Sequence, residues 1–150
     1  MKIIYKVGDF LEGEETIVCH SCNIAGGFKS GAARAVREKY PEAYDEYKEA
    51  FADGTLKLGN VQWVYTNKVV VGNMLCQASY GYDGKRYVSY DAVDEAMKKI
   101  EKKAKGKPVA FTMIGSVLGG GSWSIIKAII EDNSLSFQPV IYVLRKEDLP

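Results

Sequence analysis

The sequence predicts an α/β fold in which a mixed, mainly parallel sheet lies between two layers of helices. Short apolar runs of strand length alternate with stretches of helical periodicity along most of the 150 residues, an order typical of parallel sheets with helices on both faces. Two of the expected strands lead into glycine-rich loops, and one pair of strands is joined by only a short turn. We therefore expect a single three-layer α/β/α domain over residues 1–150.

The expected strands are short, rich in β-branched residues and bounded by turn residues. Residues 3–7 and 16–20 fit this description, and residues 61–65 and 68–72 flank Thr66-Asn67 as an antiparallel hairpin near one edge. Residues 109–114 and 140–144 are almost continuously apolar. This pattern predicts strands that are covered on both faces.

Four helices are expected between these strands. Residues 31–40 carry alanines and a valine at helical spacing, and Pro41 marks a break before a second helix that ends at Gly54. Residues 89–105 form one apolar stripe with lysines in the last turns, where they suit the helix dipole. The last helix is expected over 123–131, with Ser122 as its N-cap.

Composition restricts the classes of function. The 20 Lys and Arg residues against 19 Asp and Glu residues leave a net charge of +1. This balance argues against a protein that binds nucleic acid non-specifically. No apolar run is long enough for a transmembrane helix, and the charged start is unlike a secretory leader. Three cysteines do not make a disulfide framework. We expect a cytoplasmic monomer that has no membrane contact and no nucleic acid as its main partner.

Three loops follow expected strands at the edge where open α/β sheets bind their ligands. In the first, Asp9 either accepts a hydrogen bond from the amine of a base or only forms a turn. The second, residues 19–31, contains three glycines after Asn23, and the third has four glycines within residues 115–121. Such loops expose backbone N–H groups to anions. Two of them at one edge favour a nucleotide diphosphate bound between them.

Other catalytic and binding motifs fail on spacing. The sequence contains no G-x-x-x-x-G-K-[ST] and no G-x-S-x-G, and the third loop lacks G-x-G-x-x-G. A zinc site from Cys19, His20, Cys22 and Cys76 is disfavoured, because Cys19 and His20 are neighbours on a strand and start toward opposite faces. We expect no metal and no cofactor. His20, the single histidine, is either an acid–base group or a structural histidine under the loop.

The ordered set of loops resembles the macrodomain family of ADP-ribose-binding proteins over nearly the whole chain. The resemblance rests on Val7-Gly8-Asp9-Phe10, on the loop from Asn23 to Gly31 that runs into Ala32-Ala33, on Gly115–Gly121 followed by Trp123, and on the closing apolar strand. His20-Ser21-Cys22-Asn23 and Met74-Leu75-Cys76-Gln77 are similar to the compact branch of ADP-ribose-1″-phosphate phosphatases and ADP-ribosyl-glutamate deacylases.

This resemblance implies a role for each position. After Gly8, Asp9 would hold the adenine amine, the Phe10 N–H would contact the ring, and either Leu144 or Tyr142 would lie against it. Asn23 would orient the distal ribose. The residues implied to enclose that ribose and its phosphate are Gly26, Gly27, Phe28, Lys29, Ser30 and Gly31. Those implied around the diphosphate are Ser116, Val117, Leu118, Gly119, Gly120, Gly121 and Ser122, and Gln77 and Trp123 complete the ligand-binding set.

The activity implied is binding of ADP-ribose and hydrolysis of ADP-ribose 1″-phosphate to ADP-ribose and phosphate. His20 would act as the proton donor while Asn23 positions the ribose, and Lys29, where the family usually has glycine, would stabilise the added phosphate. A non-catalytic reader of ADP-ribose and a de-ADP-ribosylating hydrolase are the alternatives. The lysine and aspartate of the deacylases have no counterpart in Leu75-Cys76-Gln77 or Gly119-Gly120-Gly121. A β-branched residue at Gly120 is expected to block the phosphates and leave the fold intact.

Overall fold

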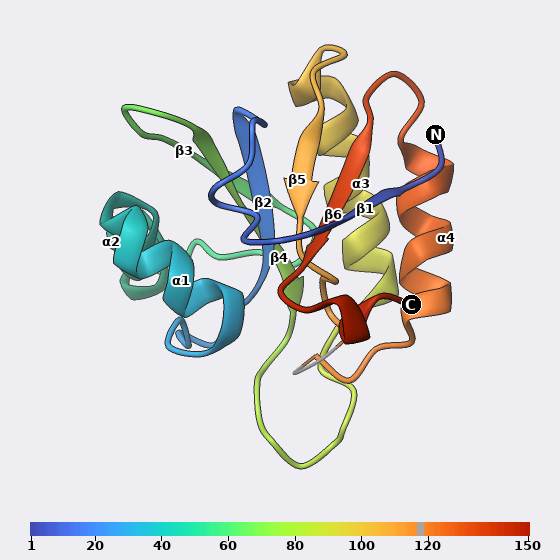
Figure 1. The fold of residues 1–150 in the computed structure, drawn as a ribbon. Coiled ribbons are helices and arrows are strands. Elements are labelled where there is room, and N and C mark those ends of the chain that lie inside the picture. The colour runs from blue at the N-terminus through green and yellow to red at the C-terminus, as the bar shows by residue number, and fades with distance from the viewer. Residues whose placement is uncertain (117–118) are drawn as a thin grey trace.

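A six-stranded sheet runs through the middle of the computed structural model, which describes residues 1–116 and 119–150 (Figure 1). The strands are β1 (Ile4–Val7), β2 (Ile17–Asn23), β3 (Val61–Tyr65), β4 (Val70–Gln77), β5 (Val109–Phe111) and β6 (Pro139–Val143), in the order β1-β6-β5-β2-β4-β3. All neighbouring strands are parallel except β3, which is antiparallel to β4. The mixed, mainly parallel sheet is confirmed.

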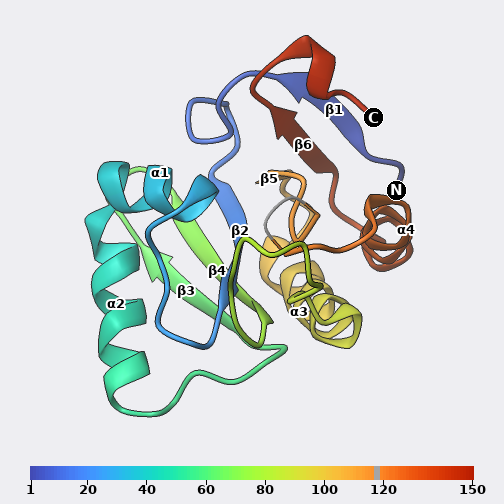
Figure 2. The same cartoon turned by 90° about the horizontal axis from the view of Figure 1, so that it is seen from below.

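Helices cover both faces of this sheet. α1 (Gly31–Lys39) and α2 (Pro41–Ala52) lie on one face, while α3 (Tyr90–Ala104) and α4 (Trp123–Asn133) lie on the other (Figure 2). A short 3-10 turn, η1 (Lys146–Asp148), follows the last strand. Among the described residues, none of the helices has the length and apolar character that a membrane crossing requires.

The alternation of side chains along each strand divides the apolar core into two layers. On β2, Ile17 and Cys19 pack with α3 and α4, whereas Val18 and Cys22 pack with α1 and α2. The central strands β4 and β6 are buried along almost their whole length. The continuous apolar character of β6 therefore comes from cover on both faces, as a parallel sheet requires.

Three strands end several residues away from the predicted position. β2 and β4 continue to Asn23 and Gln77, because their parallel pairing extends through polar residues that the apolar pattern leaves out. β5 ends at Phe111 rather than at residue 114, since Met113 and Ile114 belong to turns in which the Ile114 N–H donates to the Thr112 carbonyl at 2.8 Å. The Ile114 side chain is nevertheless 2% exposed. Its apolar character reflects burial and not strand structure.

Candidate ligand-binding site

The loops singled out by the sequence meet at one edge of the sheet. β1, β2, β4, β5 and β6 run parallel, so their carboxyl ends all point the same way. Figure 2 looks onto this edge, where the β2–α1, β4–α3 and β5–α4 loops lie between the two helical layers. Ligands of open α/β sheets bind outside such an edge. The expected location of the site is therefore consistent with the topology.

The first glycine-rich loop, residues 24–30, is organised by the side chain of Asn23. Its Oδ1 accepts hydrogen bonds from the backbone N–H groups of Ala25 and Gly27 at 2.9 and 3.1 Å, and its Nδ2 donates to the Gly27 carbonyl at 2.9 Å. Asn23 is 7% exposed. These bonds occupy most of the amide, so the structure favours a positioning role in the loop over the ribose contact and catalytic role expected from the sequence.

Tyr47 completes this loop from below and was not among the expected site residues. Its hydroxyl accepts from the Gly26 N–H at 3.1 Å and lies 2.8 Å from the carbonyl oxygen and 2.9 Å from Oδ1 of Asn23. Burial raises the pKa of this phenol, so it stays protonated as a donor. In the sequence, Tyr47 belongs to the apolar stripe of α2, and nothing local distinguishes it from a core residue.

His20 lies beneath the same loop and does not reach solvent. Its side chain is 0% exposed, and Nε2 lies 2.6 Å from Oδ1 of Asn73. The Asn73 Nδ2 donates to the Ala43 carbonyl and to Gln62 Oε1, which leaves Oδ1 as the acceptor and places the histidine proton on Nε2. Burial lowers the pKa of His20 to about 4. This geometry corrects the expectation of a proton donor at the ligand and matches the structural alternative.

Phe28 is also a core residue, in spite of its place in a loop implied to enclose the ligand. Its ring is 1% exposed and packs edge-to-face on His20 with 5.3 Å between the ring centres. Tyr44 and Tyr47 flank the same ring. The side chain of Phe28 therefore anchors the loop, and only its backbone remains for a ligand.

The four residues weighed as a zinc site lie on different faces of the sheet. Cys19 and Cys76 pack toward α3, whereas Cys22 packs toward α1 and lies 3.6 Å from His20 Nε2. All three thiols are buried and free, and burial raises the pKa of each of them. In residues 1–116 and 119–150, no cluster of side chains has the composition of a metal site.

The second glycine-rich loop is closed at its base. The Gly121 N–H donates to the Gly115 carbonyl at 2.8 Å, and the Ser116 hydroxyl donates to the Met113 carbonyl at 2.8 Å. Two residues expected to contact the diphosphate, Val117 and Leu118, lie outside the described residues. The loop thus leaves and rejoins the sheet edge at almost the same point, as a loop wrapped around an anion requires.

At the start of α4, two expected contacts take other roles. Ser122 occupies the N-cap position, but its hydroxyl lies 2.9 Å from the Ser124 hydroxyl and caps no helix N–H group. Trp123 is half-buried, and its indole N–H donates to the Tyr5 hydroxyl at 3.0 Å. Trp123 therefore ties α4 to the edge strand β1.

A segment that the sequence analysis missed, residues 78–88 between β4 and α3, connects the two glycine-rich loops. At one end, the Tyr80 ring lies against Gly27, and the Tyr82 hydroxyl contacts the Ser30 hydroxyl. At the other end, the N–H groups of Tyr87 and Val88 donate to the Gly119 carbonyl at 2.7 and 3.0 Å. We call residues 78–88 the bridging segment, because it contacts both loops at the expected ligand site.

The bridging segment also explains Gly120. A Cβ atom at Gly120 would lie 2.3 Å from the Lys85 carbonyl oxygen, and the residue has φ +70°. Both the close approach of the backbone and the left-handed conformation require glycine. A β-branched residue at Gly120 would therefore displace the bridging segment. The expectation that such a residue leaves the fold intact is wrong at this point of the structure.

The first expected loop places an exposed carboxylate at the same edge. Asp9 accepts a hydrogen bond from the Leu11 N–H through Oδ1 at 2.9 Å, which is the turn-forming role considered from the sequence. The Gly8 N–H donates to the Val143 carbonyl at 2.8 Å, and the side chain of Phe10 is buried. The second oxygen of this exposed carboxylate leaves an acceptor at the end of β1.

The structure distinguishes the two residues considered for the adenine contact. The Tyr142 ring is 9% exposed and its hydroxyl donates to Glu15 Oε1 at 2.8 Å under the β1–β2 loop. Leu144, just beyond β6, is 75% exposed. Of the two, Leu144 is the side chain that a planar ring can cover.

The remaining expected residues lie around the first loop. Gln77 is 9% exposed; its Oε1 accepts from the Ser21 hydroxyl at 3.0 Å and lies close to Gly119. Lys29 is exposed and borders a shallow hollow of about 300 Å³ together with Arg34, Arg37 and Glu38. α1 begins at Gly31 with no side-chain cap on its first N–H groups. This end of the site therefore combines a helix N-terminus with an excess of positive charge.

Comparisons with known proteins agree with this architecture. No family model and no curated protein matches the chain, but solved structures do. A protein of unknown function from Bacteroides thetaiotaomicron is 27% identical with a TM-score of 0.84, over 95% of this chain and 98% of that one. A macrodomain protein from Streptomyces coelicolor is 26% identical with a TM-score of 0.79, over 95% of this chain and 99% of that one.

A third match comes from a longer protein. Thermosipho africanus DarTG, solved in complex with ADP-ribose, is 17% identical with a TM-score of 0.82, over 99% of this chain but only 43% of that one. The chain thus has the α/β architecture of these neighbours, with four helices around a six-stranded sheet. The fold is that of macrodomains.

Proposed function

We propose that this protein binds ADP-ribose across the carboxyl edge of its sheet. The observation that carries the proposal is the pair of glycine-rich loops held side by side by the bridging segment, with Asp9 and Leu144 at one end of this edge and Lys29, in the first loop, toward the other. Adenine then lies against Leu144 and donates its amine to Asp9, the diphosphate lies between the loops, and the distal ribose lies toward Lys29. Structural neighbours solved in complex with ADP-ribose support this ligand.

Calorimetry with ADP-ribose, AMP and NAD tests the proposal. We expect ADP-ribose to bind more tightly than AMP, because only ADP-ribose fills both ends of the site. The matched variants are Leu144→Ala and Leu135→Ala, since the two leucines are 75% and 76% exposed. Loss of the Leu144 side chain should weaken ADP-ribose at least about fivefold, whereas the Leu135 variant should bind as wild type. Equal affinity for AMP and ADP-ribose would contradict the assigned distal end.

A second candidate function, hydrolysis of ADP-ribose 1″-phosphate, is favoured by the cationic residues at the distal end. Lys29 lies in the loop, and Arg34 and Arg37 border the same hollow beside the start of α1. Added negative charge on a terminal phosphate is stabilised there. For this hydrolysis, catalysis depends on the positive charges around the phosphate and on the positioning of the substrate, because His20 is buried and neutral.

Phosphate release from ADP-ribose 1″-phosphate separates this enzyme from a non-catalytic reader. For the enzyme, we expect release by the wild type, reduced release by Lys29→Gln and unchanged release by Lys48→Gln, an exposed lysine on α2. His20→Gln should retain turnover if it still folds. ADP-ribose binding without phosphate release would favour the reader, and a loss of turnover limited to the His20 variant would restore the acid–base role.

A further inference from the structure

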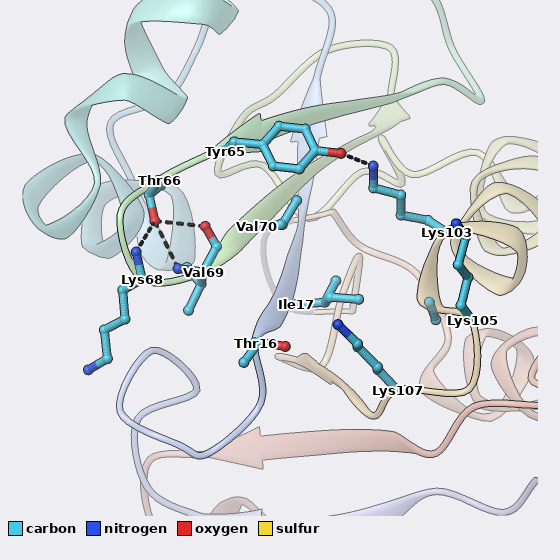
Figure 3. Close-up of a pocket in the computed structure, with 11 residues that line it drawn as sticks. Thr16, Ile17, Tyr65, Thr66, Lys68, Val69, Val70, Lys103, Lys105 and Lys107 are labelled. Carbon is cyan, nitrogen blue, oxygen red and sulfur yellow. Dashed lines mark hydrogen bonds between the residues drawn. The ribbon is translucent and has the colours of Figure 1, made fainter.

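A second hollow lies at the opposite edge of the sheet, where the parallel strands begin. It has a volume of about 380 Å³ and lies between the β3–β4 turn and the turn that leads from α3 to β5 (Figure 3). Thr16 and the first residue of β2, Ile17, are among its lining residues. The glycine-rich loops follow the far ends of these strands, so this hollow is separate from the proposed ADP-ribose site.

The charged side chains that line this hollow are all lysines. Its charged residues are Lys68, Lys103, Lys105 and Lys107, and no carboxylate is among the lining residues. Figure 3 shows the Lys107 amino group beside Ile17, while Lys68 extends away from the centre. The ion pairs found among the described residues include none with Lys103, Lys105 or Lys107. We call this site the lysine hollow.

The helix dipole does not account for this concentration of charge. The carboxyl end of a helix carries the equivalent of roughly half a negative charge, which falls off within the last turn. Lys103 lies in that turn, but Lys105 and Lys107 follow the end of α3 at Ala104. Two lysines therefore add positive charge beyond what the dipole neutralises.

The end of α3 fixes the position of Lys105. Lys105 has φ 49° and ψ 45°, and it is the one non-glycine residue in the described part of the chain with a positive φ. This left-handed conformation usually belongs to glycine or asparagine at a helix end, and it costs a residue with a Cβ about 1 kcal/mol or more. Lys105 is the C-cap residue of α3, and it lines the lysine hollow directly beyond the end of that helix.

One aromatic ring, that of Tyr65, completes the site. Lys103 lies 4.6 Å from the ring centre of Tyr65 and 5.5 Å from that of Trp63, and its amino group contacts the Tyr65 hydroxyl. Tyr65 remains 65% exposed. A planar ring beside cationic groups matches a ligand that contains both a base and phosphates, and the volume is within the range of small-ligand sites.

We propose that the lysine hollow binds a nucleoside polyphosphate, with its phosphates on Lys105 and Lys107 and its base against Tyr65. The test uses cytidine triphosphate, which lacks the adenine that the other site would select, and follows the backbone amide resonances of the protein by NMR. We expect the largest shifts at Thr16, Thr66 and Lys105. Shifts confined to the glycine-rich loops would overturn the proposal, whether or not ADP-ribose binds there.

Matched variants identify the groups that bind. Lys105→Asn with Lys107→Gln removes two charges while asparagine tolerates the left-handed turn, and we expect at least about tenfold weaker binding of cytidine triphosphate. The control, Lys48→Gln with Lys146→Gln, removes the same charge from exposed positions elsewhere and should change the affinity less than about twofold. Equal effects of the two pairs would overturn the site.

The aromatic contact has its own test. Tyr65→Phe keeps the ring and should retain binding, whereas Tyr65→Ala should weaken it. Inorganic triphosphate, which has no base, should bind more weakly than cytidine triphosphate and equally well to both Tyr65 variants. Equal affinity of the wild type for the two ligands, or tighter binding of a short single-stranded oligonucleotide, would overturn the assignment to a nucleoside polyphosphate.

Discussion

The hydroxyl of Tyr47 lies 2.9 Å from the side-chain oxygen of Asn23, beneath the first glycine-rich loop. Tyr47 belongs to α2, and its hydroxyl also accepts a hydrogen bond from the Gly26 N–H. Through these contacts α2 holds both the end of β2 and the loop that follows it. The loop amides at residues 24–27 are all occupied: Ile24 donates to the Gln77 carbonyl, Gly26 to Tyr47, and Ala25 and Gly27 to Asn23. An anion at this loop therefore has only the N–H groups that follow residue 27, in residues 28–30 and at the start of α1.

The first prediction concerns Tyr47 and uses Tyr40 as its control. Tyr47→Phe leaves the buried carbonyl and amide partners of the hydroxyl unsatisfied, so we expect a loss of about 1–3 kcal/mol in the free energy of unfolding. The Tyr40 hydroxyl is buried without a hydrogen-bond partner among the described residues, and Tyr40→Phe should be neutral or stabilising. Chemical denaturation measures both. Equal effects would contradict the role given to Tyr47.

The bridging segment gives the second prediction. Gly120 and Gly54 both have φ +70°, but a Cβ at Gly54 meets nothing within 4 Å, whereas one at Gly120 would lie 2.3 Å from the Lys85 carbonyl. Gly54→Ala therefore measures the backbone strain alone, about 1 kcal/mol. Gly120→Ala adds a steric clash that displaces the bridging segment.

Hydrogen exchange distinguishes these two variants. Amide protection of Tyr87 and Val88, which donate to the Gly119 carbonyl, should fall in Gly120→Ala and stay unchanged in Gly54→Ala. ADP-ribose affinity should fall only in the Gly120 variant. Unchanged protection at both amides would mean that residues 78–88 do not depend on this contact.

The sequence predicts the sheet edge better than it predicts the side chains that reach a ligand. The alternation of apolar runs and helices depends on burial and periodicity, which are local properties, and it places both glycine-rich loops correctly. The roles of His20, Asn23 and Phe28 depend on what packs beneath the loop. Asn73 and Tyr47 come from β4 and α2, and their registers cannot be derived from the loop's own residues.

The bridging segment was missed for a related reason. Residues 78–88 carry tyrosines and charged residues without periodicity, a pattern typical of an exposed loop, and Tyr80 and Tyr82 are indeed exposed by 54% and 75%. The contacts that define the segment are with Gly27, Ser30 and Gly119. Only the order of strands β5-β2-β4 brings these three positions around it.

The third prediction concerns Asp9. Asp9→Asn keeps the Oδ1 acceptor for the Leu11 N–H, so the turn should persist. It replaces the second carboxylate oxygen by an amide NH2 group, which cannot accept a hydrogen bond from the adenine amine. We expect at least about tenfold weaker ADP-ribose binding with unchanged thermal stability. Asp53→Asn, at the exposed end of α2, is the control. Wild-type affinity in the Asp9 variant would contradict the adenine contact.

The last prediction follows from the burial of His20, whose pKa is lowered to about 4. The neutral ring is preferred in the folded protein, while the unfolded chain binds a proton near the ordinary value of about 6.5. The contribution of His20 to stability is therefore fully present above pH 6.5 and is lost as the pH falls from 6.5 toward 4, by roughly 3 kcal/mol in total. His20 is the only histidine, so its imidazole resonances are assigned without ambiguity.

These resonances should keep the shifts of the neutral ring, with the proton on Nε2 bonded to Asn73, from pH 8 down to about 5. Over the same range, the free energy of unfolding should fall in the wild type and change little in His20→Gln, because the carboxylates that favour folding titrate at lower pH. A histidine that titrates near pH 6.5 in the folded protein would show that the ring reaches solvent. It would then be free to act as the acid that the sequence first suggested.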